Sequence, residues 1–159
     1  MLTPQKMEAA RKDALTFLKR KTAAVIATVR DNAPSASTVF FVVDDSFNFY
    51  FTTQVNTHKH ENISRNANVS LVIGSGPKLI SVSVQGIAQA IEGNEKIAIL
   101  EKFISMKLVH WPIMEMAKFK DTQRVVYKVV PSRLSYMNLD DEDYSASKSN
   151  EYAVLIPSA

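Results

Sequence analysis

Six stretches rich in β-branched and aromatic residues, separated by turn residues, constrain this chain of 159 residues to a mostly antiparallel β fold. In the fifth stretch apolar and polar residues alternate, as in a strand with one buried face. An open sheet of this size would expose long hydrophobic edges, so closure into a barrel is the economical arrangement. The predicted strands are 21–30, 35–43, 47–53, 69–73, 78–91 and 122–130, the last ended by Pro131.

Helical spacing of apolar residues predicts helices around this barrel. The first has Thr3 as its cap and Pro4 at its first helical position, a common pair at helix starts. The predicted helices are 5–20, 57–66 and 94–106, with a further helical piece from Pro112 to Phe119. Turn residues at 31–34 and 74–77 separate neighbouring strands.

The length suits a single domain, residues 1–138, followed by a tail, residues 139–159. The tail is acidic and serine-rich up to residue 150, which predicts flexibility, and apolar enough over 151–157 to dock on the domain. The chain has no cysteine, which excludes disulfides and thiolate metal sites. With no signal peptide and no apolar stretch of the ~18 residues a membrane helix needs, a cytoplasmic protein without membrane contact is expected.

The net charge of +3 only weakly favours anionic partners. Nucleic-acid binding on an exposed barrel strand would need aromatic residues interleaved with basic ones. Phe47, Phe49 and Phe51 alternate instead with Asn48 and Tyr50, which indicates core residues. We therefore expect no nucleic-acid partner, and a phosphorylated small molecule fits the charge equally well.

Segment 51–71 carries the most chemical information. A strand ending in Thr52 and Thr53 leads to a helix start that contains Thr57 and Lys59. Free N–H groups and the positive dipole end of a helix favour an anion, and charge-assisted hydrogen bonds are worth roughly 1.5–3 kcal/mol each. The alternative is purely structural, with Thr57 as a plain N-cap and Lys59 pointing into water.

Segment 51–71, together with 24–34, 83–88 and 127–134, resembles the pyridoxamine 5′-phosphate oxidase-like FMN-binding split-barrel superfamily over residues 20–137. The resemblance implies a mainly β (α+β) fold: a six-stranded antiparallel split β-barrel with peripheral helices. It also implies a homodimer that holds FMN in sites lined by both subunits.

The resemblance further implies eight cofactor-binding residues and no catalytic side chain. Lys59 and Thr57 would hold the phosphate, and Thr52 and Thr53 would line the phosphate and ribityl region. The remaining four would face the flavin ring: Ser37, Thr38 and Val39 through their main chain, and Ser81 from the fifth strand. Ser37, Thr38 and Ser81 could equally be ordinary solvent-facing strand residues.

The chain departs from true pyridoxamine phosphate oxidases at two positions. Those enzymes carry Arg where this chain has Ser37 and Lys where it has Val42, and they end in a basic segment with a Trp. Oxidation of vitamin B6 is therefore not expected. The chain resembles the shorter members of the superfamily, which include general-stress flavoproteins, flavin reductases, nitroimidazole-resistance-type reductases and deazaflavin-using relatives.

Other chemistries find less support. His58 and His60 with Glu61 do not predict a metal site, because helix residues two apart point to different sides. Neither a nucleophile-elbow motif nor a dinucleotide-binding glycine motif is present. The roles of Trp111 and Arg124 stay open.

The preferred function is that of an FMN-dependent oxidoreductase with a small-molecule electron donor or acceptor, in which the ring carries the reaction. The alternative is a split barrel that binds, stores or senses flavin, deazaflavin or haem without turnover.

Overall fold

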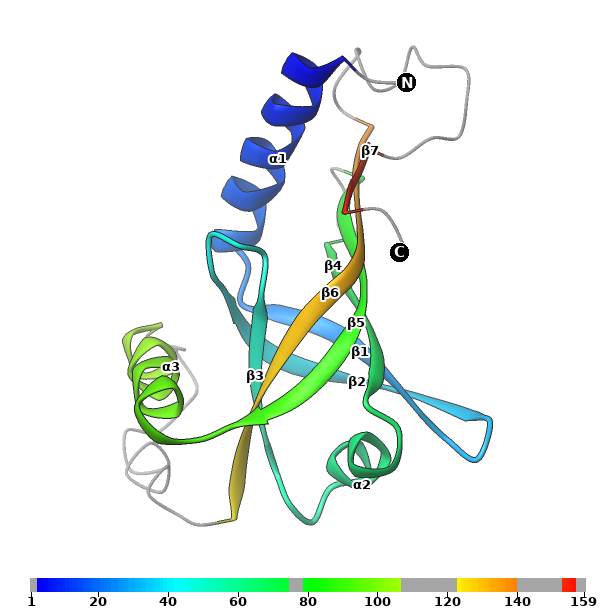
Figure 1. The fold of residues 1–159 in the computed structure, drawn as a ribbon, viewed down its shortest axis with the longest axis vertical. Coiled ribbons are helices and arrows are strands. Elements are labelled where there is room, and N and C mark those ends of the chain that lie inside the picture. The colour runs from blue at the N-terminus through cyan, green and yellow to red at the C-terminus, as the bar shows by residue number, and fades with distance from the viewer. Residues whose placement is uncertain (1–2, 75–78, 107–122, 140–152, 157–159) are drawn as a thin grey trace.

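The computed structural model describes residues 3–74, 79–106, 123–139 and 153–156. Within them the chain forms three helices and seven strands (Figure 1). The helices are α1 (Pro4–Lys19), α2 (His58–Arg65) and α3 (Gly93–Ser105), and the strands are β1 (Ala23–Arg30), β2 (Ala33–Val43), β3 (Phe49–Gln54), β4 (Asn68–Gly74), β5 (Ile80–Ile91), β6 (Arg124–Asn138) and β7 (Ala153–Ile156). The predicted helical piece from Pro112, Trp111 and most of the acidic tail lie outside the described residues.

Strands β1 to β6 form a closed antiparallel barrel, which confirms the predicted fold class. Their order is β3-β2-β1-β4-β5-β6, and pairing of β3 with β6 closes the ring. Strand β6 is long enough to run beside β5, pair with β3 at its start and pair with β7 near its end. The apolar end of the chain thus adds a seventh strand beside β6.

The predicted end of β6 at Pro131 is wrong, because the strand continues to Asn138. Pro131 lies opposite Gly86, where the β5–β6 register shifts between Gln85 and Gly86. Proline is tolerated at such an irregularity because its missing N–H is not needed there. Gly86 lets the strands approach closely, since a Cβ atom on it would lie 2.5 Å from the Val130 carbonyl oxygen.

Two turns differ in length from the sequence prediction, the first being shorter and the second longer. Asp31 and Asn32 both have positive φ values, 49° and 62°, as in a two-residue hairpin turn, so β2 begins at Ala33. Phe47 also has a positive φ and belongs to the turn before β3, which begins at Phe49.

Buried side chains form two clusters. The larger one fills the barrel and extends beneath α1, whose small residues Ala10 and Ala14 allow close packing. The smaller cluster lies under α3 and includes Ile99, Phe103 and Val126. In the described part of the chain, no helix has both the length and the apolar composition that crossing a bilayer requires.

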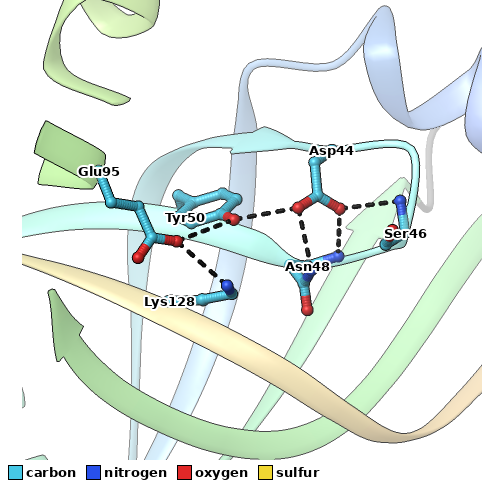
Figure 2. Close-up of polar contacts among 6 residues, drawn as sticks. All are labelled: Asp44, Ser46, Asn48, Tyr50, Glu95 and Lys128. Atoms are coloured by element: carbon cyan, nitrogen blue, oxygen red, sulfur yellow. Dashed lines mark hydrogen bonds and ion pairs between the residues drawn. The ribbon is translucent and has the colours of Figure 1, made fainter. Parts of the chain in front are cut away.

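A polar network fastens the β2–β3 turn and α3 to the barrel (Figure 2). The Asp44 carboxylate accepts hydrogen bonds from the Ser46 and Asn48 main-chain N–H groups at 2.9 Å and from the Tyr50 hydroxyl at 3.0 Å. The Tyr50 oxygen also lies 3.5 Å from Glu95 of α3, which accepts a 3.1 Å hydrogen bond from Lys128 of β6. One network therefore joins the turn, a helix and the strand that closes the barrel.

The Asp44 hydrogen bonds make stability depend on pH. Partial burial raises the pKa of this carboxyl, but hydrogen bonds from Asn48, Tyr50 and Ser46 outweigh it, so the pKa is lower than its ordinary value of 3.8. The charged form is favoured on folding, so its contribution is present above about pH 4 and is lost as the pH falls through the lowered pKa.

We predict that Asp44→Asn reduces the free energy of unfolding at about pH 7 but much less at about pH 3, where the native carboxyl is also becoming neutral. Urea denaturation at the two pH values measures this. The control Asp13→Asn changes an exposed residue of α1 and should alter stability little at either pH. An equal loss at both pH values for Asp44→Asn would contradict the prediction.

Candidate functional site

A corner forms where β3 leads into α2, and we call it the β3–α2 corner. The Thr57 hydroxyl donates to the Gln54 carbonyl oxygen at 2.8 Å and accepts from the His60 N–H at 3.2 Å. Thr53 Oγ1 lies 2.9 Å from Thr57 Oγ1 and, because the Thr57 hydrogen is already used, Thr53 is the donor. Thr57 is thus the N-cap of α2, and Thr53 holds it in place.

The corner still presents unused donors. The Thr57 side chain and main chain satisfy the N–H groups of His60 and Glu61. The N–H groups of His58 and Lys59, in the first turn of α2, have no acceptor among the described residues. An anion at this position would meet two N–H groups and the positive end of the helix dipole.

Lys59 adds a full positive charge to the corner. Its side chain is partly buried, and this burial lowers the pKa of the ammonium group. Within the described ranges no carboxylate pairs with it. Removing a charged group from water without giving it a partner costs free energy, and the attraction of a bound anion would offset this cost.

Two side-chain contacts hold α2 against β1. The Asn62 amide donates to the buried Thr28 hydroxyl at 3.0 Å, and Arg30 forms a 2.5 Å ion pair with Glu61. These contacts fix the first turn of the helix relative to the barrel.

A third contact joins α2 to β6. The Tyr127 hydroxyl lies 2.8 Å from His60 Nδ1, and the Tyr127 ring stacks on Phe51 with centroids 5.4 Å apart. Burial raises the pKa of Tyr127, so the phenol stays protonated at neutral pH. The contact with Tyr127 gives His60 a structural role at the corner. In the part of the chain that the structure describes, no three His, Asp or Glu side chains lie close enough together to hold a metal ion.

Thr52 lies on the opposite face of β3 from Thr53, because successive side chains of a strand point to opposite sides. Its hydroxyl oxygen is buried and has no hydrogen-bond partner among the described residues. A buried hydroxyl without a partner costs about 1–3 kcal/mol. The two threonine side chains therefore lie on different faces of β3, beyond the residues that pair with β2.

Ser37, Thr38 and Val39 lie on β2, before the residues that pair with β3. The Phe41 N–H group donates to the Thr22 carbonyl, so the main-chain groups of Phe41 face β1. Main-chain groups alternate in direction along a strand, so those of Ser37 and Val39 also face β1. The main-chain groups of Thr38 point to the other side of β2, where no strand pairs with them among the described residues. The Val39 side chain is buried in the core.

Ser81 lies far from these residues. It is on β5, which is three strand steps from β2 in either direction round the barrel. At ~4.8 Å per step this is roughly 14 Å across the sheet. The chain brings Thr53 into contact with Thr57, with Lys59 in the first turn of the same helix, but it does not bring Ser81 to them.

A family model described as pyridoxamine 5′-phosphate oxidase matches residues 10–138. No curated protein matches the sequence. Solved structures with the same fold include a protein assigned as a pyridoxamine 5′-phosphate oxidase from Listeria innocua, at 22% identity and a TM-score of 0.66 over 80% of this chain and 98% of that one.

Two further structures extend the likeness. General stress protein 26 from Bacillus anthracis is 24% identical, with a TM-score of 0.64 over 79% of this chain and 92% of that one. A heme binding protein from Mycobacterium smegmatis is 17% identical, with a TM-score of 0.62 over 86% of this chain and 55% of that one. At these identities the structural likenesses establish the fold alone.

We predict that Asn62→Ala lowers the free energy of unfolding by about 1–3 kcal/mol, because it leaves the buried Thr28 hydroxyl without its partner. Chemical denaturation measures the change. The control Ser64→Ala, at an exposed position of the same helix, should change stability by less than about 0.5 kcal/mol. Equal effects of the two variants would show that the Asn62 contact does not anchor α2.

Proposed function

The chain belongs to the pyridoxamine 5′-phosphate oxidase family, and on this basis we propose that it binds FMN at the β3–α2 corner and acts as an FMN-dependent oxidoreductase. The observation that carries the proposal is Lys59, a partly buried ammonium group without a carboxylate partner among the described residues, beside two unused N–H groups. Phosphate is the part of FMN that such a set of donors would bind.

The energetics favour a phosphate at this corner. Charge-assisted hydrogen bonds contribute roughly 1.5–3 kcal/mol each, so Lys59 and the N–H groups of His58 and Lys59 together suffice for firm binding. Thr53 and Thr57 shape the corner, and a rotation of the Thr53 hydroxyl would add another donor. The unpaired Thr52 hydroxyl is a candidate partner for the ribityl chain.

The flavin ring would lie against the open edge of β2, where the main chain of Thr38 offers donors and acceptors. Ser37 and Val39 would contribute through the surface around it. Ser81 would come from the second subunit of a homodimer, because it lies on the far side of the same chain's barrel.

The outer face of the barrel supports a homodimer. Val25 and Val72 pair across β1 and β4, and both side chains are exposed, by 47% and 41%. Ile87 and Val130 pair across β5 and β6 and are also exposed. Exposed apolar residues on adjacent strands are typical of a surface that a partner covers.

Bound FMN would supply the hydride and electron chemistry, with a small-molecule electron donor or acceptor. The protein's own residues would bind and orient the cofactor, and none acts as a catalytic acid or base in this proposal. Because Ser37 and Val42 replace the Arg and Lys of true pyridoxamine phosphate oxidases, vitamin B6 oxidation is not proposed.

The second candidate is a binding protein without turnover, for flavin, deazaflavin or haem. It is favoured by the likeness to the heme binding protein from Mycobacterium smegmatis. The two candidates differ in whether the bound group is reduced by a physiological donor.

A visible spectrum of the purified protein tests these functions. A band near about 450 nm, which is a property of flavins, indicates bound FMN, and its bleaching by NADH or NADPH indicates an oxidoreductase. A flavin band that neither donor bleaches favours storage or sensing, and an intense band near about 400 nm indicates haem. If the protein takes up none of FMN, a deazaflavin and haem when each is added in excess, both proposals fail.

We predict that Lys59→Ala weakens FMN binding by about tenfold or more, equivalent to about 1.4 kcal/mol or more. Arg65→Ala is the matched control, because it removes a positive charge from the exposed last turn of the same helix. Its FMN affinity should change by less than about threefold. Fluorescence titration of FMN measures both, and an unchanged affinity for Lys59→Ala would remove this residue from the site.

A further inference from the structure

A cavity of about 470 Å³ lies between α1 and α3, away from the β3–α2 corner. Its walls come from the end of α1, the connection between α1 and β1, the last residues of β2 and the end of α3. Helix α2, which forms the corner, lies at the opposite end of the barrel from α1 (Figure 1). The cavity is therefore separate from the proposed phosphate position.

The floor of the cavity is apolar. Its accessible apolar surface comes from three half-buried residues, Val42, Val43 and Met106. The lining residues Leu18 and Phe41 belong to the barrel core and are only 0% and 1% exposed. The volume is within the ~300–1,000 Å³ of typical small-molecule sites, so an aromatic or branched body would fit.

Three lysines surround this floor. Lys19 forms an ion pair with Asp45, and the Lys21 ammonium lies 5.1 Å from the centre of the Phe17 ring. Neither Lys21 nor Lys102 has a carboxylate partner in the described ranges. The cavity thus has three ammonium groups and one carboxylate near it.

The ends of two helices do not account for these charges. α1 and α3 both end at the cavity, and each C-terminus is equivalent to about −0.5 charge. Together the two helix ends offset about one of the three positive charges of the lining lysines, so they do not balance them.

Two carbonyl groups near the end of each helix already accept hydrogen bonds. In α1 the Phe17 and Leu18 carbonyls accept from the Arg20 and Lys21 N–H groups. In α3 the Phe103 carbonyl accepts from the Met106 N–H group and the Lys102 carbonyl accepts from the Ser105 hydroxyl. These four carbonyl groups do not need the lysine side chains as donors.

We propose that this cavity binds a small organic anion with an apolar body, such as an aryl or acyl carboxylate, sulfonate or phosphate. The body lies on Val42, Val43 and Met106, and the anionic head lies between Lys21 and Lys102. Binding here is independent of the FMN proposal, because the two sites share no residue.

The test uses the probe 8-anilinonaphthalene-1-sulfonate, which fluoresces when bound, on the full chain with and without saturating FMN. We expect one saturable site per chain that excess FMN does not displace. The double variant Lys21→Gln/Lys102→Gln should weaken probe binding by about tenfold or more. The control Lys12→Gln/Lys96→Gln also removes two positive charges, one from α1 and one from α3, at positions outside the cavity lining. Its affinity for the probe should change by less than about threefold.

A second variant tests position rather than charge. Ser105→Trp places a large ring at the cavity wall and should abolish the saturable binding, while a thermal melt shows that the fold is retained. Three outcomes would overturn the proposal: unsaturable binding, displacement of the probe by FMN, or equal affinity of the double variant and the wild type. Equally tight binding of the uncharged probe N-phenyl-1-naphthylamine would also overturn it, because the anionic head would then contribute nothing.

Discussion

Pairing between β3 and β6 closes the barrel, and the rest of the structure depends on it. The pairing runs over six residues of β3, from Phe49 to Gln54. Only the first three also pair with β2, so from Thr52 onward β3 pairs with β6 alone. No strand among the described residues pairs with this side of β2 near Thr38. The β3–β6 pairing also fixes where β3 ends and therefore where α2 and the donor-rich corner begin.

The sequence predicted the barrel well because alternation identifies the buried face of each strand. In β5, Val82 and Val84 are buried as their spacing requires. The prediction failed at Pro131, where the residue type indicates a strand end. The reason is partly nonlocal, since Gly86, which faces Pro131, lies on the neighbouring strand. The register shift leaves Ser132 of β6 without a partner residue on β5, and no residue type near Pro131 indicates it.

In the candidate site, too, local features could be predicted from the sequence and nonlocal contacts could not. Thr57 and Lys59 could be placed at the start of a helix because a helix start has a local pattern. The contacts that hold α2 could not be predicted, since Asn62 meets Thr28 across 34 positions and Tyr127 meets His60 across 67. The helical spacing of Asn62 was visible, but an amide on the buried face becomes informative only once its partner is known. Such residues shape the corner without belonging to any short motif.

Under the proposed function, Lys59 links stability to binding. Burial disfavours its charged form in the folded state, as its lowered pKa indicates, and no carboxylate pairs with it among the described residues. An anion bound only by the folded chain would stabilise that state more strongly the more tightly it binds. It would also offset the cost of the buried charge, which a neutral ligand could not do.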